Sequence, residues 1–222
     1  MIKGLKRWVR IQNPKFRFLE KHFSNTPFRL LDIGAGNSSC TKTRSAFPQC
    51  AYYGLDLNRD YANNAEDFER MEAFYEMDLT KLEFSSIPDD YFDAILIVHV
   101  IEHLHNGDAV IAGLIPKLKA GGVIYVEYPG KKSLTLPSMK GTLNYYDDSS
   151  HVRVYSVEEL KKVFDRNGCT VLRSGLRRSW FYIMVMPLRI LRRWMLGRSV
   201  TGNIFWDVLG FAEFLEARKQ TT

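Results

Sequence analysis

The chain has 222 residues, of which 45% are hydrophobic and 25% are charged. This composition is typical of a globular protein with a sizeable core, and it excludes a disordered chain. The three cysteines are scattered without metal-ligand spacing, as in proteins of a reducing compartment. Basic residues interrupt the apolar positions of the N-terminus, so we expect no signal peptide. The sequence therefore predicts one cytoplasmic domain over residues 1–222.

The formal net charge of +6 is distributed unevenly along the chain. Residues 1–29 carry +7 and residues 173–222 carry +6, which leaves −7 on residues 30–172. Basic ends around an acidic centre indicate an anionic partner, although a solvated basic surface would have the same composition.

Residues 1–27 are expected to form two basic helices. Apolar positions recur on both sides of Asn13-Pro14. The proline should separate the two helices, because it lacks a backbone N–H. A core of residues 28–175 should follow.

The stretch 29–39 predicts an apolar strand that ends at Asp32, a turn at Gly34 and Gly36, and a helix capped by a serine. Such a turn at the carboxyl end of a parallel strand is typical of a nucleotide pocket. A dinucleotide is a poor fit, because Asp32 would repel a pyrophosphate and Ser39 stands in place of the motif's third glycine. A cationic ligand fits better, and an ordinary strand-turn is the alternative.

Two further segments are predicted to be strands that end in an acid. Residues 51–58 contain Asp56, which follows Gly36 by 20 residues. At this spacing in a βαβ unit, a carboxylate accepts hydrogen bonds from ribose hydroxyls. Residues 73–79 contain Asp78.

The next two strands should be buried. Residues 92–98 form an apolar run that leads into His99-x-x-Glu102-His103. Residues 118–126 begin with Leu-x-x-Gly-Gly, a turn into a fifth strand.

Taken in this order, the segments resemble those of the class I S-adenosylmethionine (SAM)-dependent methyltransferases. Asp-x-Gly-x-Gly is similar to motif I of that family, which lies under the methionine part of the cofactor. The resemblance covers roughly residues 28–175 and implies an α/β fold with a seven-stranded, mostly parallel sheet, helices on both faces and an antiparallel last strand. It implies Asp56 at the ribose and Asp78 at the adenine amino group. The SAM-binding residues that it implies are Asp32, Gly34, Gly36, Asp56, Leu57, Asp78, Leu79 and His99.

A loop without clear periodicity, residues 129–150, follows the fifth strand. A loop of this length inside a compact domain is usually functional, and in the family this segment commonly covers the acceptor. His151 ends the loop and His103 follows the fourth strand. We therefore expect both histidines at the acceptor pocket, where either could act as a catalytic base for a hydroxyl.

The histidines also allow a metal hypothesis. His99-x-x-Glu102-His103 matches the inverted zinc-peptidase motif, but that motif needs both histidines on one helix. A closer resemblance is to methyltransferases that carry Glu-x-x-Glu-His and a later histidine and bind a divalent metal. Here His99 replaces the first glutamate, so His99, Glu102, His103 and His151 would suit a transition metal better than Mg²⁺. Metal-free relatives also have Glu-His-Leu at this position, and we expect no metal.

The C-terminal part is the least similar to the family. After a sixth strand at 169–175, residues 176–204 form a basic and apolar insertion, and residues 205–219 should contain the last strand. Within the insertion, residues 188–198 predict an amphipathic helix that is either an interfacial membrane helix or a lid. Three arginines share one of its faces: Arg189, Arg192 and Arg193.

These features predict a SAM-dependent methyltransferase that acts on a hydroxyl of a small molecule, a sugar or a lipid-linked glycan. An anionic membrane surface is a possible second partner, reached through the C-terminal segment at the inner face of a membrane. The alternatives are an RNA methyltransferase and a non-catalytic SAM-binding module at a membrane. Nucleic acid is the less favoured partner. The Asn-Pro-Pro-Tyr type of motif, which is associated with methylation of exocyclic amines on nucleic acid, does not follow the fourth strand.

Overall fold

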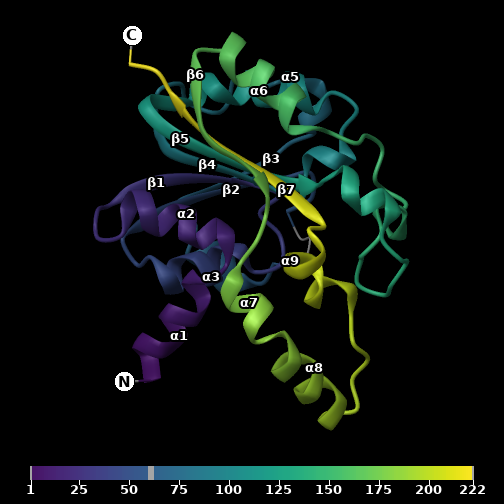
Figure 1. Cartoon of the computed structure of the whole chain (residues 1–222). Coiled ribbons are helices and arrows are strands. Elements are labelled where there is room, and N and C mark those ends of the chain that lie inside the picture. The colour runs from purple at the N-terminus through teal and green to yellow at the C-terminus, as the bar shows by residue number, and fades with distance from the viewer. Residues whose placement is uncertain (1, 60–62, 222) are drawn as a thin grey trace.

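The computed structural model describes residues 2–59 and 63–221, with side chains from residue 7 onward. Its centre is a seven-stranded sheet (Figure 1) in the order β3-β2-β1-β4-β5-β7-β6. The first five strands pair in parallel, while β7 is antiparallel to both β5 and β6. The expected fold class is confirmed. The strands are β1 (Phe28–Ile33), β2 (Cys50–Asp56), β3 (Ala73–Glu76), β4 (Phe92–Val98), β5 (Leu118–Pro129), β6 (Cys169–Leu176) and β7 (Ala212–Lys219).

Helices cover both faces of the sheet (Figure 1). One face carries α2 (Pro14–Phe23) and α3 (Ser39–Ala46), and the other carries α5 (Gly107–Leu114) and α6 (Val157–Arg166). Successive strand residues point to opposite faces, so neighbours in β1 enter different cores: Leu30 packs on the α2–α3 side and Leu31 on the α5–α6 side.

The N-terminal helices separate where the sequence predicts. α1 (Ile2–Ile11) ends before Asn13, whose side chain accepts a hydrogen bond from the Lys15 backbone N–H at the start of α2. Pro14 occupies the first turn of α2, where its missing N–H costs no hydrogen bond.

Between β2 and β3 the sequence predicts a helix over residues 58–70, and the observed helix is shorter. The structure has α4 at Ala65–Glu69 only, and residues 60–62 lie outside the described part of the chain. Asn64 caps α4 by accepting from the Asp67 N–H at 3.0 Å, while Asp67 accepts from the Asn64 N–H at 3.1 Å. Asparagine competes with helical hydrogen bonding, so the helix begins after Asn64.

The loop of residues 129–150 is ordered by one carboxylate. Asp147 accepts hydrogen bonds from the backbone N–H groups of Met139, Leu143 and Asn144 and from the Ser138 hydroxyl. Burial opposes ionisation of Asp147, but these donors outweigh it and lower its pKa. Two short 3₁₀ turns, Lys131–Thr135 and Tyr145–Asp147, give the loop its only regular structure among the described residues.

Residues 177–211 form an arm inserted between β6 and β7. The arm contains α7 (Trp180–Met184), α8 (Met186–Met195), a 3₁₀ turn at Gly202–Ile204 and α9 (Trp206–Leu209). The last strand is therefore shorter than the 205–219 region, because α9 occupies its first part. None of the described helices has the length and hydrophobicity needed to cross a bilayer.

Candidate active site

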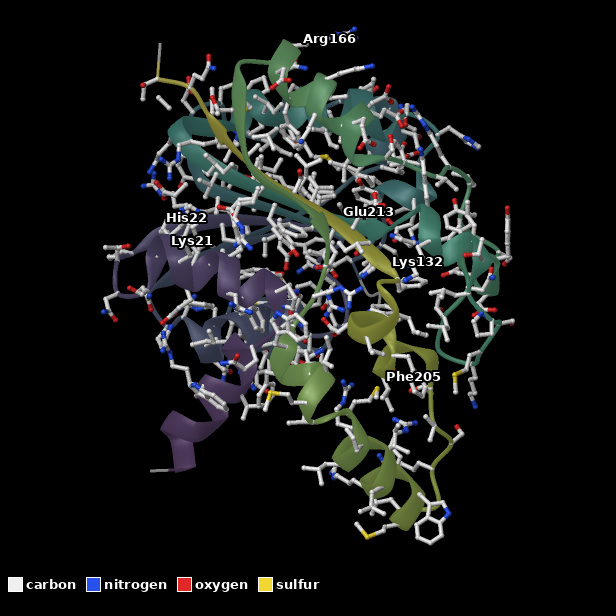
Figure 2. The ribbon with its side chains drawn as sticks, viewed as in Figure 1. Lys21, His22, Lys132, Arg166, Phe205 and Glu213 are labelled. Atoms are coloured by element: carbon white, nitrogen blue, oxygen red, sulfur yellow. The ribbon has the colours of Figure 1, made fainter. Side chains whose placement is uncertain are left out.

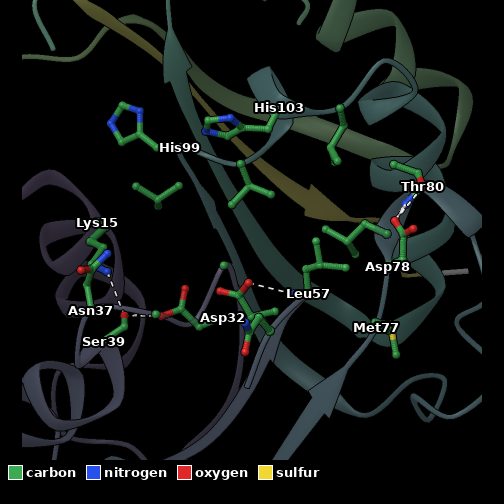
Figure 3. A pocket seen from close by; sticks show the side chains of 18 of the residues that line it. Lys15, Asp32, Asn37, Ser39, Leu57, Met77, Asp78, Thr80, His99 and His103 are labelled. Carbon is green, nitrogen blue, oxygen red and sulfur yellow. Dashed lines mark hydrogen bonds between the residues drawn. The ribbon is translucent and has the colours of Figure 1, made fainter. Parts of the chain in front are cut away.

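A cavity of about 670 Å³ opens at the carboxyl ends of the parallel strands. All eight residues predicted to bind the cofactor line it, as does His103. Figure 3 shows His99 and His103 on one side, with Asp32 and Asp78 across from them. Segments far apart in sequence converge here because the strands are parallel and end at the same edge of the sheet.

Asp32 is fixed at the floor of the cavity. Its side chain is 2% exposed and accepts hydrogen bonds from the Ser39 hydroxyl at 2.6 Å and the Tyr52 hydroxyl at 2.7 Å. Lys15 in turn donates to the Ser39 hydroxyl at 3.2 Å (Figure 3). The helix starts at the expected serines, with Ser38 at the N-cap of α3, but the Ser38 side chain makes no capping hydrogen bond and Ser39 donates to Asp32 instead.

The glycine turn brings backbone close to the cavity. Gly34 has φ +77°, and a Cβ there would lie 2.5 Å from Cγ2 of Val100. Its N–H donates to the Leu55 carbonyl at 2.8 Å, which ties the turn to β2. Only glycine satisfies both the left-handed backbone and the close contact.

The acids at the carboxyl ends of β2 and β3 have different environments. Asp56 accepts a hydrogen bond from the Leu57 N–H at 2.8 Å. Burial raises the pKa of Asp56, and this effect outweighs the backbone hydrogen bonds from Leu57 and Asn58, which lower it. Asp78 accepts from the Thr80 N–H and hydroxyl, which lower its pKa. Leu57 beside them is 67% exposed on the cavity wall and can cover a flat apolar ring.

His99 carries a positive charge on the other wall. Its Nδ1 lies 3.2 Å from Glu102 Oε1, and its Nε2 lies 3.2 Å from Glu127 Oε1. Burial alone would lower the pKa of His99, but the two carboxylates outweigh it and raise the pKa to about 9. The residue has φ +56°, a strained backbone for a side chain of this size.

A buried charge network behind His99 was not predicted from the sequence. Glu127 is 3.2 Å from Arg177 Nε, and Arg177 reaches Asp207 at 3.1 Å. Burial would raise the pKa of Glu127, but Arg177, His99 and the Tyr125 hydroxyl lower it to about 2. The sequence feature that could have indicated this network is Glu127 inside the apolar run of β5, because an unpaired buried charge is costly and requires a partner.

Trp206 of α9 joins the arm to this wall. Its ring centroid lies 4.9 Å from that of His99 and 4.6 Å from that of Phe211, on which it is stacked. Its Nε1–H donates to the Thr142 carbonyl at 2.6 Å in the long loop. The arm and the long loop therefore pack behind His99, which lines the cavity.

His103 and His151 pack together, although only His103 lines the cavity. Their ring centroids are 4.9 Å apart. His103 Nδ1 is 3.2 Å from the Ser150 carbonyl, and His151 Nδ1 is 2.7 Å from the Tyr145 carbonyl. The tautomers that donate from Nδ1 leave both Nε2 atoms as acceptors.

The same cluster has the donor set of a metal site. Glu102 is 1% exposed, and its Oε2 has no hydrogen-bond partner among the described residues. Glu102, His103 and His151 each offer a ligand atom, all within 4.8 Å of one another. The carbonyl contacts of both Nδ1 atoms are of the kind that orient metal ligands. His99 does not belong to this set, because both of its nitrogens face carboxylates.

Comparison with known proteins agrees with this geometry. Residues 8–174 match a family model described as a methyltransferase domain. No curated protein matches the sequence. A SAM-dependent methyltransferase from Archaeoglobus fulgidus is similar in structure, with 21% identity, TM-score 0.60 and coverage of 98% of this chain and 94% of that chain.

Two other solved structures show the same fold. One is phosphoethanolamine N-methyltransferase 2 of Haemonchus contortus in complex with SAM: 17% identity, TM-score 0.64, 92% of this chain and 52% of that chain. The other is a SAM-dependent methyltransferase from Mesorhizobium loti: 14% identity, TM-score 0.62, 92% of this chain and 97% of that chain. The fold is that of a class I SAM-dependent methyltransferase. The chain belongs to the methyltransferase-domain family, and its cofactor is SAM.

Proposed function

We propose that the protein transfers the methyl group of SAM to a hydroxyl of a small molecule, a sugar or a lipid-linked glycan. His103 is the general base and His151 positions it. The observation that carries this proposal is the histidine pair: His103 faces the cavity, with its Nδ1 held by Ser150 and its ring packed on His151.

In this proposal, residues at the carboxyl ends of different strands bind different parts of the cofactor. Asp32 and the turn at Gly34 face the methionine part, whose ammonium and sulfonium are positive. Asp56 accepts from the ribose hydroxyls, and Asp78 accepts from the adenine amino group. Leu57 and Leu79 cover the adenine ring. The charged His99 on the facing wall suits the methionine carboxylate.

Methyl transfer needs alignment first. The acceptor oxygen must lie in line with the methyl carbon and the sulfur, and a preformed cavity favours this arrangement. SAM bound in the cavity would supply an electrophilic methyl group to that oxygen. The products are the methyl ether and S-adenosylhomocysteine (SAH), and the hydroxyl proton passes to His103 Nε2.

The presence of a base distinguishes a hydroxyl acceptor from an amine acceptor. A neutral amine needs no base to attack, whereas a hydroxyl gains from one. The fold leaves this open, since one of its structural neighbours is named for methylation at nitrogen. A base at the cavity wall therefore supports oxygen as the acceptor.

The test supplies methyl-labelled SAM together with four acceptor pools: small hydroxylated metabolites, free sugars, lipid-linked glycans and RNA. The proposal predicts label on an oxygen of one of the first three pools, with no transfer by His103→Ala. Label on nitrogen, on carbon or in RNA would contradict it. Salt-sensitive RNA binding with transfer to RNA would favour the alternative, an RNA methyltransferase whose basic ends contact phosphates.

A further inference from the structure

The arm exposes an apolar stripe over α7 and α8. Its side chains recur at intervals of three or four residues within each helix: Trp180 and Met184 on α7, and Leu188, Leu191 and Met195 on α8. Each is between 48% and 77% exposed. No residue of α7 or α8 is buried, so these helices contribute little to the core of the protein.

This stripe is where the exposed apolar surface is concentrated. Fifteen large apolar side chains are exposed among the described residues, and seven of them lie within residues 180–196. Trp8 of α1, itself 52% exposed, extends the patch by edge contact with the Phe181 ring at 5.2 Å. Apolar surface gathered in this way indicates an interaction site rather than scattered surface residues.

The charge around the stripe has one sign. Residues 166–206 contain no Asp or Glu, and neither do residues 1–19. The arginines of α8 and its C-terminal turn flank the stripe: Arg189, Arg192, Arg193 and Arg198. Trp and Leu on one face with Arg beside them are the composition of a helix that lies in the interface of an anionic bilayer.

The arm is placed to present this surface. Figures 1 and 2 show α8 at the opposite end of the molecule from Arg166, the last residue of α6. The N-terminal end of the arm is held by Ser179. The Ser179 N–H donates to Asp207 at 2.6 Å, and its hydroxyl donates to the Gln12 carbonyl at 3.0 Å. The return segment of the arm contacts the long loop, where the Gly202 N–H donates to the Lys140 carbonyl at 2.8 Å. Further along this segment, Trp206 of α9 packs on His99 of the cavity wall.

We propose that the α7–α8 arm docks the protein on an anionic bilayer surface. The apolar stripe enters the interface and the arginines contact lipid phosphates. Because Trp206 of the arm packs on His99 of the cavity wall, docking brings the cavity close to the membrane. Together with the proposed function, on which this step rests, docking selects an acceptor carried by the membrane, a lipid or a lipid-linked glycan.

Co-sedimentation with two kinds of vesicle tests the docking. One kind is phosphatidylcholine alone, and the other contains phosphatidylglycerol at about a third of the lipid. The parent should sediment with the second kind and much less with the first. Leu188→Ser/Leu191→Ser and Arg192→Glu/Arg198→Glu should each weaken binding roughly tenfold or more, because burial of leucine and attraction of arginine each contribute on the order of 1 kcal/mol per residue.

Matched controls lie on the far side of the molecule. Lys161→Glu/Lys162→Glu changes two exposed charges of α6, and Leu172→Ser changes an exposed apolar residue of β6. Both should bind vesicles like the parent. SAH binding, measured by calorimetry for every variant, checks the fold and separates the two proposals: a variant that loses vesicles should still bind SAH.

Three outcomes would overturn the docking proposal while leaving methyl transfer intact. The first is equal sedimentation by the parent and both arm variants, or sedimentation by none of them. The second is a concentration-dependent dimer of the parent that Leu188→Ser/Leu191→Ser converts to a monomer, since a second copy would then cover the stripe. The third is RNA binding through the same arginines without vesicle binding. Vesicle binding by a parent that makes no methylated product would leave docking intact and contradict the proposed function.

Discussion

His103 and His151 lie with their ring centroids 4.9 Å apart, one in the 3₁₀ turn Ile101–His103 that follows β4 and the other at the end of the long loop. The contact joins the cofactor half of the cavity to the segment expected to cover the acceptor. His103 reaches the cavity, while His151 stands behind it with its side chain 4% exposed. The two histidines therefore have different roles, which substitutions can separate.

Replacing His103 by Ala should lower kcat by roughly 10²–10⁴-fold, the usual contribution of a positioned base. SAH affinity should change little. His151→Ala should lower kcat less, and His151→Gln should recover much of the loss, because glutamine can still donate to the Tyr145 carbonyl. Steady-state kinetics with calorimetry for SAH measures both effects. His105→Gln, at an exposed neighbouring histidine, is the control. Near-parent turnover of His103→Ala would remove the base from the mechanism.

The metal alternative gives a different pattern. If His103 acts as a base without a metal, dialysis against a chelator should leave turnover unchanged. If Glu102, His103 and His151 hold an ion, the chelator should abolish turnover, and zinc, cobalt or manganese should restore it. Metal content of the purified protein, measured by mass spectrometry for the parent and for Glu102→Gln, is a readout independent of activity. An ion present in the parent and absent from the variant would replace the base mechanism.

His99 should make stability depend on pH. Its folded pKa of about 9 is raised above the usual value of 6.5, so its stabilising contribution is complete below pH 6.5 and is lost as pH rises through 9. His99→Gln should therefore lower the free energy of unfolding by roughly 1–3 kcal/mol at pH 6.5 and by less at pH 9.5. Urea unfolding at both pH values measures the difference. A gap that stays constant, or that widens with pH, would show that His99 is not held as the cation.

The glycine turn makes a steric prediction. Gly34→Ala should lower stability and SAH affinity together, because it adds both a strained φ and a contact with Val100. Gly168→Ala is a matched control: its φ is +69°, but nothing lies within 4 Å of the added Cβ. The excess loss in Gly34→Ala should be roughly 1–3 kcal/mol, and Val100→Ala in the same chain should recover part of it. Equal losses at the two glycines would show that the close contact does not matter.

The sequence was sufficient to predict the strands that carry the cofactor residues. Buried parallel strands are continuous apolar runs, and the acid that ends each run marks the edge of the sheet. Asp32, Asp56 and Asp78 therefore fall where their strands predict, around one cavity.

The contacts between the arm and the cavity wall could not be predicted in the same way. Glu127, Arg177 and Asp207 are far apart in sequence, and each is stable in the interior only because the others are there. Trp206 lies in a segment expected to belong to the last strand, and its packing on Phe211 and His99 favours a short helix instead. Local propensity contains no information about such tertiary partners.

The most direct test of the account is titration of the protein with SAH, SAM and NAD in a calorimeter. The cavity should bind SAH and SAM at one site per chain and NAD far more weakly. Asp56→Ala should lose roughly 1–3 kcal/mol of SAH binding, because the ribose hydroxyls lose their acceptor. Asp165→Ala, an exposed acid on α6, should bind like the parent. Tight binding of NAD without SAH, or parent-like SAH affinity in Asp56→Ala, would contradict the assignment of this cavity to the cofactor.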